Sequence, residues 1–152
     1  MVNVYNIIMS NIKRGYFRYI GSGSCRDVFD LGNGYVAKVA KNMAGLEQNK
    51  CEYRISSNDK SDLIAKVIKV SHNYEILIME KAQSINNISY VWRYFNVANK
   101  KELFNLREIQ NLKKRYNLLL GDFNRESSWG IINGKPVIID YGFTRDIKAR
   151  YY

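Results

Sequence analysis

The sequence is poor in several residue types on which common sites and folds depend. Its 152 residues include two cysteines, one proline and one histidine. Cys25 and Cys51 cannot form a disulfide framework, and nothing indicates secretion, so we expect two free thiols in a reducing cytoplasm. His72 stands alone in a turn-like segment, with no cysteine or histidine at metal-ligand spacing. The sequence therefore has no zinc signature, and it also lacks a nucleophile elbow.

Long hydrophobic runs are missing as well. No stretch approaches the roughly 20 residues of a membrane span. Residues 1–10 contain polar Asn3 and Asn6, unlike a signal peptide, so we expect a cytoplasmic protein with no membrane partner. The chain is nevertheless 46% hydrophobic, which is enough for one core. Because no repeat or Pro/Ser-rich linker divides it, we expect a single domain over residues 1–152.

Acidic residues are scarce relative to basic ones. There are 14 Asp and Glu against 24 Lys and Arg, a formal net charge of +10. Such a charge attracts nucleic acid, nucleotides or acidic partners, but it also fits a solvated lysine-rich surface. The charges are spread from Lys13 to Arg150 without a dense block, which favours the second interpretation. Abundant tyrosine and phenylalanine could stack on bases or fill the core, so a nucleic-acid partner stays an alternative.

The first half of the chain has the pattern of a sheet with one helix. It predicts strands at residues 16–20, 27–31, 35–40, 64–70 and 75–79, and a helix over residues 45–55 that Ser56–Asp59 interrupts. Gly21-Ser22-Gly23-Ser24 joins the first two strands. Leu31-Gly32-Asn33-Gly34 forms the next turn, since Asn-Gly is a strong hairpin signal. Residues 71–73 join the last two strands.

The second half is mainly helical and then returns to strand. Residues 85–96 fit neither pattern clearly. Asn99 predicts the cap of a helix that runs to about Leu119 and ends at Gly121, because apolar side chains recur there every three or four residues. Residues 129–132 and 136–139 predict a second hairpin around Asn133-Gly134.

The segment Val137–Gly142 is the most informative feature. A β-branched run ends in Asp140, Tyr141 and Gly142, which is typical of a buried strand. The acid stands where the strand ends, so its carboxylate can face a cleft. A charged oxygen at that place could bind a divalent cation.

Lys38 interrupts the otherwise apolar strand Val36–Ala40. A lysine that faces a buried cleft needs an anion, either a phosphate or a carboxylate. The following helix offers Glu47 and Glu52, and we favour Glu52 because it lies near the middle of the helix. The alternative is an edge lysine that extends its ammonium group into water.

Two loops complete the candidate site. In the first, Gly21 and Gly23 lack a β-carbon, so backbone amides could approach phosphate oxygens and Arg26 could add charge; a plain hairpin turn is the alternative. In the second, residues 121–130, Asp122 could accept the proton of an attacking hydroxyl or merely cap a turn. Asn124, Ser127 or Ser128 could supply a neutral oxygen to a cation.

Together these residues resemble the protein-kinase-like superfamily. The order that matches is Gly21–Phe29, Val36-Ala37-Lys38, the helix with Glu52, Met79–Ala82, Asp122 and Asp140-Tyr141-Gly142. The resemblance covers about residues 16–145 and is greatest to small kinase-like proteins of bacteria and their phages. It implies an α+β, minimal two-lobed fold with a five-stranded antiparallel N-lobe (residues 1–82) and a reduced helical C-lobe (residues 83–152).

The resemblance also implies roles for individual residues. It implies that the loop Gly21, Ser22, Gly23 and Ser24 covers the phosphates, and that Lys38 holds them and pairs with Glu52. It implies an adenine pocket made by Met79, the Glu80 carbonyl and the Ala82 amide. It also implies that Asp122 is the catalytic acid/base and that Asp140 binds Mg²⁺. The family places a second metal-binding residue, Asn, five residues after the acid/base, where this chain has Ser127.

The resemblance leaves three functions open. The first is an ATP- and Mg²⁺-dependent phosphotransferase that acts on a hydroxyl acceptor, for which a protein serine or threonine is one candidate. The second is an inactive pseudokinase that binds a nucleotide or a partner, which Ser127 and the short C-lobe favour. The third is a basic protein associated with nucleic acid.

Overall fold

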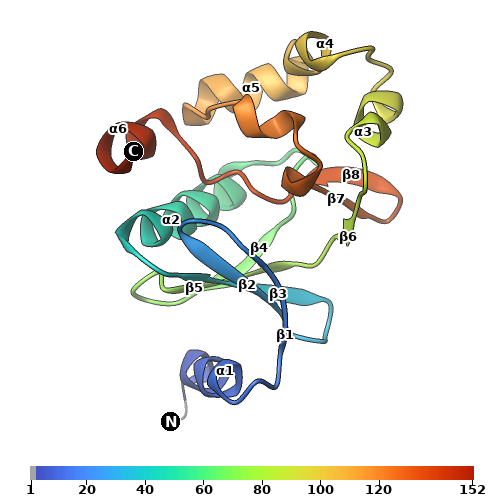
Figure 1. The fold of residues 1–152 in the computed structure, drawn as a ribbon. Helices are drawn as coiled ribbons and strands as arrows, with labels where there is room; N and C mark the ends of the chain where they lie inside the picture. The colour runs from blue at the N-terminus through green and yellow to red at the C-terminus, as the bar shows by residue number, and fades with distance from the viewer. Residues whose placement is uncertain (1–2) are drawn as a thin grey trace.

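The computed structural model of the chain describes residues 3–152. Met1 and Val2, the start of the segment that we expect not to be a signal peptide, lie outside the described residues. Figure 1 shows a sheet near the N-terminal end of the molecule and a group of helices with a smaller sheet at the other end. Every helix within residues 3–152 is too short or too polar to span a lipid bilayer.

The N-terminal part contains two helices and five strands. They are α1 (Val4–Lys13), β1 (Arg18–Ser22), β2 (Arg26–Asp30), β3 (Tyr35–Ala40), α2 (Met43–Asn58), β4 (Val67–Val70) and β5 (Ile76–Glu80). The strands form one antiparallel sheet in the order β1-β2-β3-β5-β4. The predicted five-stranded sheet is confirmed. Because β3 is the central strand, the alternative of an edge position for Lys38 is wrong.

The C-terminal part contains a second sheet and several short helices. Its elements are β6 (Gln83–Ser84), α3 (Ser89–Tyr94), α4 (Lys100–Phe104), α5 (Arg107–Tyr116), two 3₁₀ helices (Gly121–Asn124 and Glu126–Ser128), β7 (Trp129–Ile132), β8 (Lys135–Ile138) and α6 (Arg145–Tyr151). The small sheet has the order β6-β7-β8. The fold is α+β, with a five-stranded antiparallel N-lobe and a reduced helical C-lobe, as the resemblance implies.

Helix α2 is longer than the predicted span of residues 45–55. It begins after Asn42, whose side-chain oxygen accepts a hydrogen bond from the Gly45 amide at 3.0 Å. The supposed breakers continue the helix, because the side chains of Ser57 and Asn58 donate to the carbonyls four residues before them, each at 2.7 Å. Polar side chains that bond back in this way are compatible with a last helical turn.

The strand predicted over residues 64–70 is shorter at its start. Strand β4 begins only at Val67, because Ile64 pairs in a parallel bridge with Ile138 of β8. The Ile138 amide donates to the Leu63 carbonyl at 2.7 Å, and the Ala65 amide donates to the Ile138 carbonyl at 2.9 Å. Residues 63–65 therefore join the two lobes and do not extend the large sheet.

The long helix predicted from Asn99 to Leu119 is two helices. Asn99 caps α4 as expected, since its side-chain oxygen accepts from the Glu102 amide at 2.9 Å. The chain then breaks at Leu106, which has extended backbone angles (φ −58°, ψ 138°). The break is stabilised by the side chain of Gln110, which donates to the Phe104 carbonyl at 2.6 Å. The shared apolar face survives the break, because Leu103 and the apolar residues of α5 are all buried.

The end of the second helix also differs from the prediction. Helix α5 ends at Tyr116, and Asn117 adopts a left-handed conformation (φ 58°) that closes it. An asparagine tolerates this conformation almost as glycine does, so Gly121 is not needed as the stop and instead begins a 3₁₀ helix. The second hairpin agrees with its turn signal, because Asn133 (φ 52°) and Gly134 (φ 77°) both have positive φ between β7 and β8.

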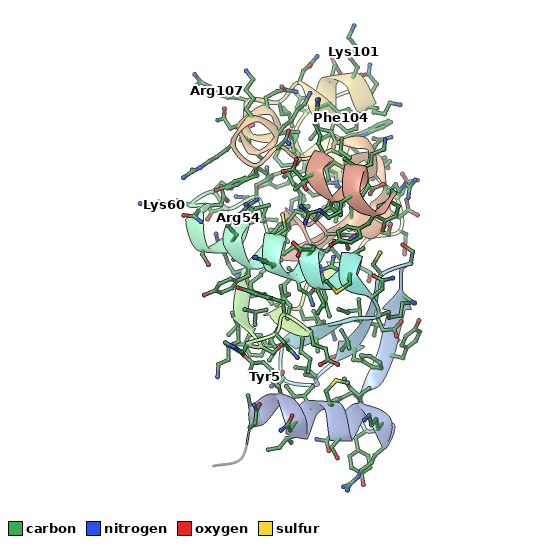
Figure 2. The ribbon with its side chains drawn as sticks, turned by 90° about the vertical axis from the view of Figure 1, so that its left-hand side faces the viewer. Tyr5, Arg54, Lys60, Lys101, Phe104 and Arg107 are labelled. Carbon is green, nitrogen blue, oxygen red and sulfur yellow. The ribbon has the colours of Figure 1, made fainter. Side chains whose placement is uncertain are left out.

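The two terminal helices cover opposite parts of the molecule. Helix α1 packs Ile8 against a cluster that includes Ala37 and Ile76, and the hydroxyl of Tyr5 donates to the Val70 carbonyl of β4 at 3.0 Å (Figure 2). Helix α6 begins after Thr144, whose hydroxyl oxygen accepts from the Ile147 amide at 3.2 Å. Helix α2 lies between the sheet and the C-terminal helices, where the main core forms (Figure 1).

Candidate functional site

A buried ion pair joins β3 to α2. The ammonium nitrogen of Lys38 lies 3.0 and 3.2 Å from the two carboxylate oxygens of Glu52. Lys38 is 5% exposed and Glu52 is 0% exposed, so the pair is shielded from water. The predicted partner is therefore the correct one, and Glu47 is not involved.

Glu52 accepts three further hydrogen bonds. The guanidinium nitrogens of Arg26 lie 2.7 and 3.2 Å from its oxygens, and the Tyr141 amide donates at 2.9 Å. Burial acts to raise the pKa of Glu52, but the charges of Arg26 and Lys38 outweigh it and lower the pKa to about 2. The carboxylate is therefore ionised and fully paired, which a buried charge requires.

Arg26 is a site residue that the sequence reasoning treated only as an optional charge. It is 6% exposed, and beyond Glu52 it donates to the side-chain oxygen of Asn49 at 3.0 Å and to Asp140 at 3.1 Å. Burial acts to lower the pKa of Arg26, but the nearby charges of Glu52 and Asp140 raise it above its usual value. The available signal was an arginine two residues after the glycine loop, at the start of a strand that pairs with the apolar strand β3.

The Asp140-Tyr141-Gly142 segment lies directly against α2. A β-carbon on Gly142 would stand 2.7 Å from the Gln48 carbonyl oxygen, so only glycine fits there. The hydroxyl of buried Tyr141 donates to the Ala65 carbonyl at 2.6 Å. Lys38 also donates to the Ile139 carbonyl. These contacts hold the backbone in place and leave the Asp140 side chain 52% exposed.

The glycine loop covers the start of β2 and is open to solvent. A β-carbon on Gly21 or Gly23 would meet no other atom within 4 Å, so neither glycine is required by packing. Ser22 and Ser24 are exposed. The Ser24 hydroxyl lies 3.3 Å from the Tyr152 hydroxyl. The backbone of the loop is therefore accessible from the solvent.

The residues proposed for an adenine pocket lie at the end of β5. Met79 is 1% exposed and pairs with Val36 of β3. The side chain of Glu80 accepts a hydrogen bond from the Lys66 amide at 2.9 Å, so it anchors the strand end. Ala82 packs closely on β7, where a β-carbon on Gly130 would lie 2.5 Å from the Ala82 methyl group. The segment Glu80–Ala82, which connects the two lobes, is thus held to the chain around it at both of its ends.

The loop with Asp122 lies on the first 3₁₀ helix of the C-lobe. Asp122 is partly exposed and pairs with Arg125 at 3.4 Å. Asn124 accepts a hydrogen bond from the Trp92 indole at 3.1 Å, and Ser127 is exposed. The carbonyl of buried Ser128 accepts from the Ile139 amide at 2.8 Å, so this loop is tied to the strand that leads to Asp140.

The structure thus brings some predicted site residues into contact and keeps others apart. Lys38, Glu52 and Asp140 are connected, directly or through Arg26. No hydrogen bond or ion pair within residues 3–152 links Asp122 or Ser127 to them. In the same range, no group of three or more His, Cys, Asp or Glu side chains gathers as a metal site. A Mg²⁺ ion that is held by one carboxylate and by substrate phosphates does not need such a group, so Asp140 fits this mode of binding.

Comparisons with known proteins give a match in fold. No protein-family model matches the sequence, and no curated protein matches it significantly. The structure of APH(2'')-IIa with streptomycin and ATP is similar, with 18% identity, 93% of this chain and 72% of that chain covered, and a TM-score of 0.50. Aminoglycoside phosphotransferase APH(2'')-Ib with ADP has 16% identity, coverages of 91% and 69%, and a TM-score of 0.52.

A third structure agrees with these two. The complex of APH(2'')-IIa with gentamicin has 19% identity, coverages of 93% and 71%, and a TM-score of 0.53. Aminoglycoside phosphotransferases belong to the protein-kinase-like superfamily. With the strand order of the large sheet, the Lys38–Glu52 pair and these neighbours, the chain is shown to have the protein-kinase-like fold.

Proposed function

We propose that this protein is an ATP-dependent phosphotransferase of the kinase-like type. Its two lobes, residues 1–82 and 83–152, would form one domain with the nucleotide between them. The observation that carries the proposal is the buried Lys38–Glu52 pair, 3.0 Å at its shortest. The half-exposed carboxylate of Asp140 is joined to this pair by the guanidinium of Arg26, which binds both Glu52 and Asp140. Two of the structural neighbours hold ATP or ADP, which supports a nucleotide in the same fold here.

Each residue of the proposed site has a distinct task. Lys38, held by Glu52, would bind the α- and β-phosphates under the loop Gly21–Ser24. The base would lie between Met79 and the connector, where the Glu80 carbonyl and the Ala82 amide would hydrogen-bond it. Catalysis would then arise from positioning and from neutralising the charge of the transferred phosphoryl group.

A divalent cation would be held at Asp140. Its carboxylate is charged and accessible, and Ser127 offers a second, neutral oxygen from the neighbouring loop. Mg²⁺ keeps several waters and takes only one or two protein carboxylates when phosphates supply the other ligands. When bound, the ion would neutralise negative charge on the phosphates.

The acceptor would be a compound with a hydroxyl group, and Asp122 would act as the acid/base that accepts the proton of this hydroxyl. The structural neighbours are phosphotransferases of aminoglycosides, which are polycations. This chain has 12 Lys and Arg against six Asp and Glu after residue 82, a balance that repels a polycation. We therefore propose a neutral or acidic acceptor, with a protein hydroxyl as one candidate.

One observation favours a second candidate, an inactive pseudokinase. The Arg26 guanidinium, which Glu52 holds in place at 2.7 Å, lies 3.1 Å from Asp140 and would compete with a cation for that carboxylate. Ser127 is also a poorer Mg²⁺ ligand than an amide oxygen. A pseudokinase would bind nucleotide or a partner and transfer nothing.

The nucleotide site is tested by melting temperature with and without ATP and Mg²⁺. A ligand that binds only the native state stabilises it by about 2.7 kcal/mol at a hundredfold excess over Kd. We expect Lys38→Ala to lose most of the shift relative to its own ligand-free state. Lys69→Ala, which changes an exposed lysine of the edge strand β4, should keep it. An equal shift in the two variants would place the phosphates elsewhere.

A further inference from the structure

A polar hollow lies on the other side of α2 from the Lys38–Glu52 pair. It has a volume of about 430 Å³. Three elements line it: α2 contributes Arg54 and Asn58, the end of α5 contributes Arg115, Tyr116 and Asn117, and α6 contributes Asp146. Figure 2 shows Arg54 on the side of α2 that faces the C-terminal helices. A molecule bound there would contact both lobes.

Tyr116 gives this hollow its distinctive feature. The residue is 8% exposed, and its hydroxyl is buried without any hydrogen-bond partner, the one such side-chain atom among the described residues. A buried hydroxyl without a partner is destabilising. Burial raises the pKa of Tyr116, with Arg115 acting in the opposite direction. The hydroxyl therefore stays protonated and can donate a hydrogen bond.

The two arginines of the hollow also have donors to offer. Within residues 3–152, neither Arg54 nor Arg115 has a carboxylate within ion-pair distance. Arg115 lies over the Tyr116 ring, 5.4 Å from its centre. Guanidinium groups present planar pairs of N–H donors that match a phosphate group. Two of them beside a tyrosine hydroxyl and the amide of Asn117 form a set of donors for an oxyanion, whereas the Asn58 amide already donates to the Arg54 carbonyl at 2.7 Å.

A second hollow of about 510 Å³ adjoins the first and shares Arg54, Asn58 and Asp146 with it. It continues along α2 past Lys50 and Tyr53. The Asp146 carboxylate lines both hollows and repels an anion that approaches it, so the phosphate would bind at the arginines and Asp146 would accept hydrogen bonds from hydroxyl groups on the rest of a ligand. The two hollows together have room for more than an inorganic ion.

From these contacts we propose that the hollow between α2, α5 and α6 binds a phosphate group, either free or as the monoester of a hydroxyl-bearing small molecule. Arg54, Arg115 and the Tyr116 hydroxyl would bind the phosphate oxygens. The organic part of a monoester would extend along α2 toward Tyr53. This site is separate from the proposed nucleotide site and does not depend on phosphotransferase activity.

The test is calorimetric titration of the full chain with inorganic phosphate, glucose 6-phosphate and glucose. We expect phosphate or its ester to bind, and glucose not to bind. Tighter binding of the ester would identify a monoester site, and equal binding would identify free phosphate as the ligand. Absence of heat with both phosphates at millimolar concentration would overturn the proposal.

Variants locate the site. Arg115→Gln should weaken binding about tenfold, the loss of a charge-assisted hydrogen bond, whereas Arg107→Gln, an exposed arginine at the start of the same helix, should not. Tyr116→Phe should weaken binding several-fold and leave the ligand-free melting temperature unchanged or higher, because it removes an unpaired hydroxyl.

Two results would contradict this location. Equal losses of affinity in Arg115→Gln and Arg107→Gln would show that binding depends on net charge and not on this hollow. Binding that is lost in Lys38→Ala but kept in Arg115→Gln would place the phosphate in the cleft. Either result contradicts the proposal.

Discussion

A guanidinium nitrogen of Arg26 lies 3.1 Å from a carboxylate oxygen of Asp140. The contact joins the strand after the glycine loop to the acid that follows β8, two points 114 residues apart. Asp140 is half exposed, whereas Arg26 is buried and also held by Glu52. A cation at Asp140 would therefore compete with a charge that the fold already positions there.

Asp140→Asn should separate metal binding from folding. The substitution keeps the shape of the side chain and removes its charge. Because Asp140 is half exposed and Arg26 keeps its two bonds to Glu52 when the Asp140 charge is removed, the ligand-free melting temperature should change little. We expect Mg²⁺ to strengthen ATP binding to the wild type and not to the variant, measured by calorimetry with and without the ion. An undiminished effect of Mg²⁺ in the variant would place the metal on other ligands.

Glu52→Gln should be strongly destabilising. It leaves the buried charges of Lys38 and Arg26 without their shared carboxylate, and breaking a buried pair from one side costs about 3–5 kcal/mol. The free energy of unfolding in urea measures the loss. Glu47→Gln, five residues earlier on the same helix and outside the ion-pair network, should change it by about 0.5 kcal/mol or less. Similar effects of the two substitutions would contradict the role given to Glu52.

The pH dependence of stability should carry the signature of Glu52. Its pKa is about 2 in the folded protein, against an ordinary value of 4.5. A lowered pKa means that the stabilisation is fully present above pH 4.5 and is lost as the pH falls toward 2. Melting temperatures between pH 6 and 2 should therefore fall steeply below about 4.5. In Glu52→Gln the fall should be shallower, and an equal slope in both proteins would show that other carboxylates govern acid unfolding.

Asp122→Asn should affect transfer and not nucleotide binding. Asp122 lies on the C-lobe loop and contacts only Arg125 among charged groups of the described chain. Loss of a general base slows a reaction by about 10²–10⁴-fold, so the rate with any accepted hydroxyl substrate should drop by that order. The Kd of ATP should stay within a factor of two or so, since the residue addresses the acceptor. A large loss of ATP affinity would assign Asp122 to the nucleotide.

Local patterns predicted the parts of the fold that depend on local chemistry. The Asn133-Gly134 turn follows from two residues that tolerate positive φ, and the choice of Glu52 over Glu47 follows from helical position. The same reasoning failed where a tertiary contact replaces a local rule. Ile64 leaves its expected strand because Ile138 of the other lobe offers backbone partners, and the helix after Asn99 breaks at Leu106 although its apolar period continues.

The role of Arg26 could not be derived from spacing. Its side chain reaches Glu52 and Asp140 only after β2, α2 and the end of β8 have come together, and none of these distances is local. The same limit applies to the hollow beside Tyr116. Arg54 and Arg115 both line this hollow, but they are far apart in the sequence and no sequence pattern predicts that they lie together.

The central claim is phosphoryl transfer from ATP, and ATP labelled at the γ-phosphate tests it most directly. The wild type is incubated with labelled ATP and Mg²⁺ together with casein, a hexose, an aminoglycoside or a cell lysate, and the label on each acceptor is counted beside Asp140→Asn. We predict label on a neutral or acidic acceptor with the wild type, none above background with Asp140→Asn, and none on the aminoglycoside. A wild type that binds ATP and labels nothing would contradict the account and identify a pseudokinase.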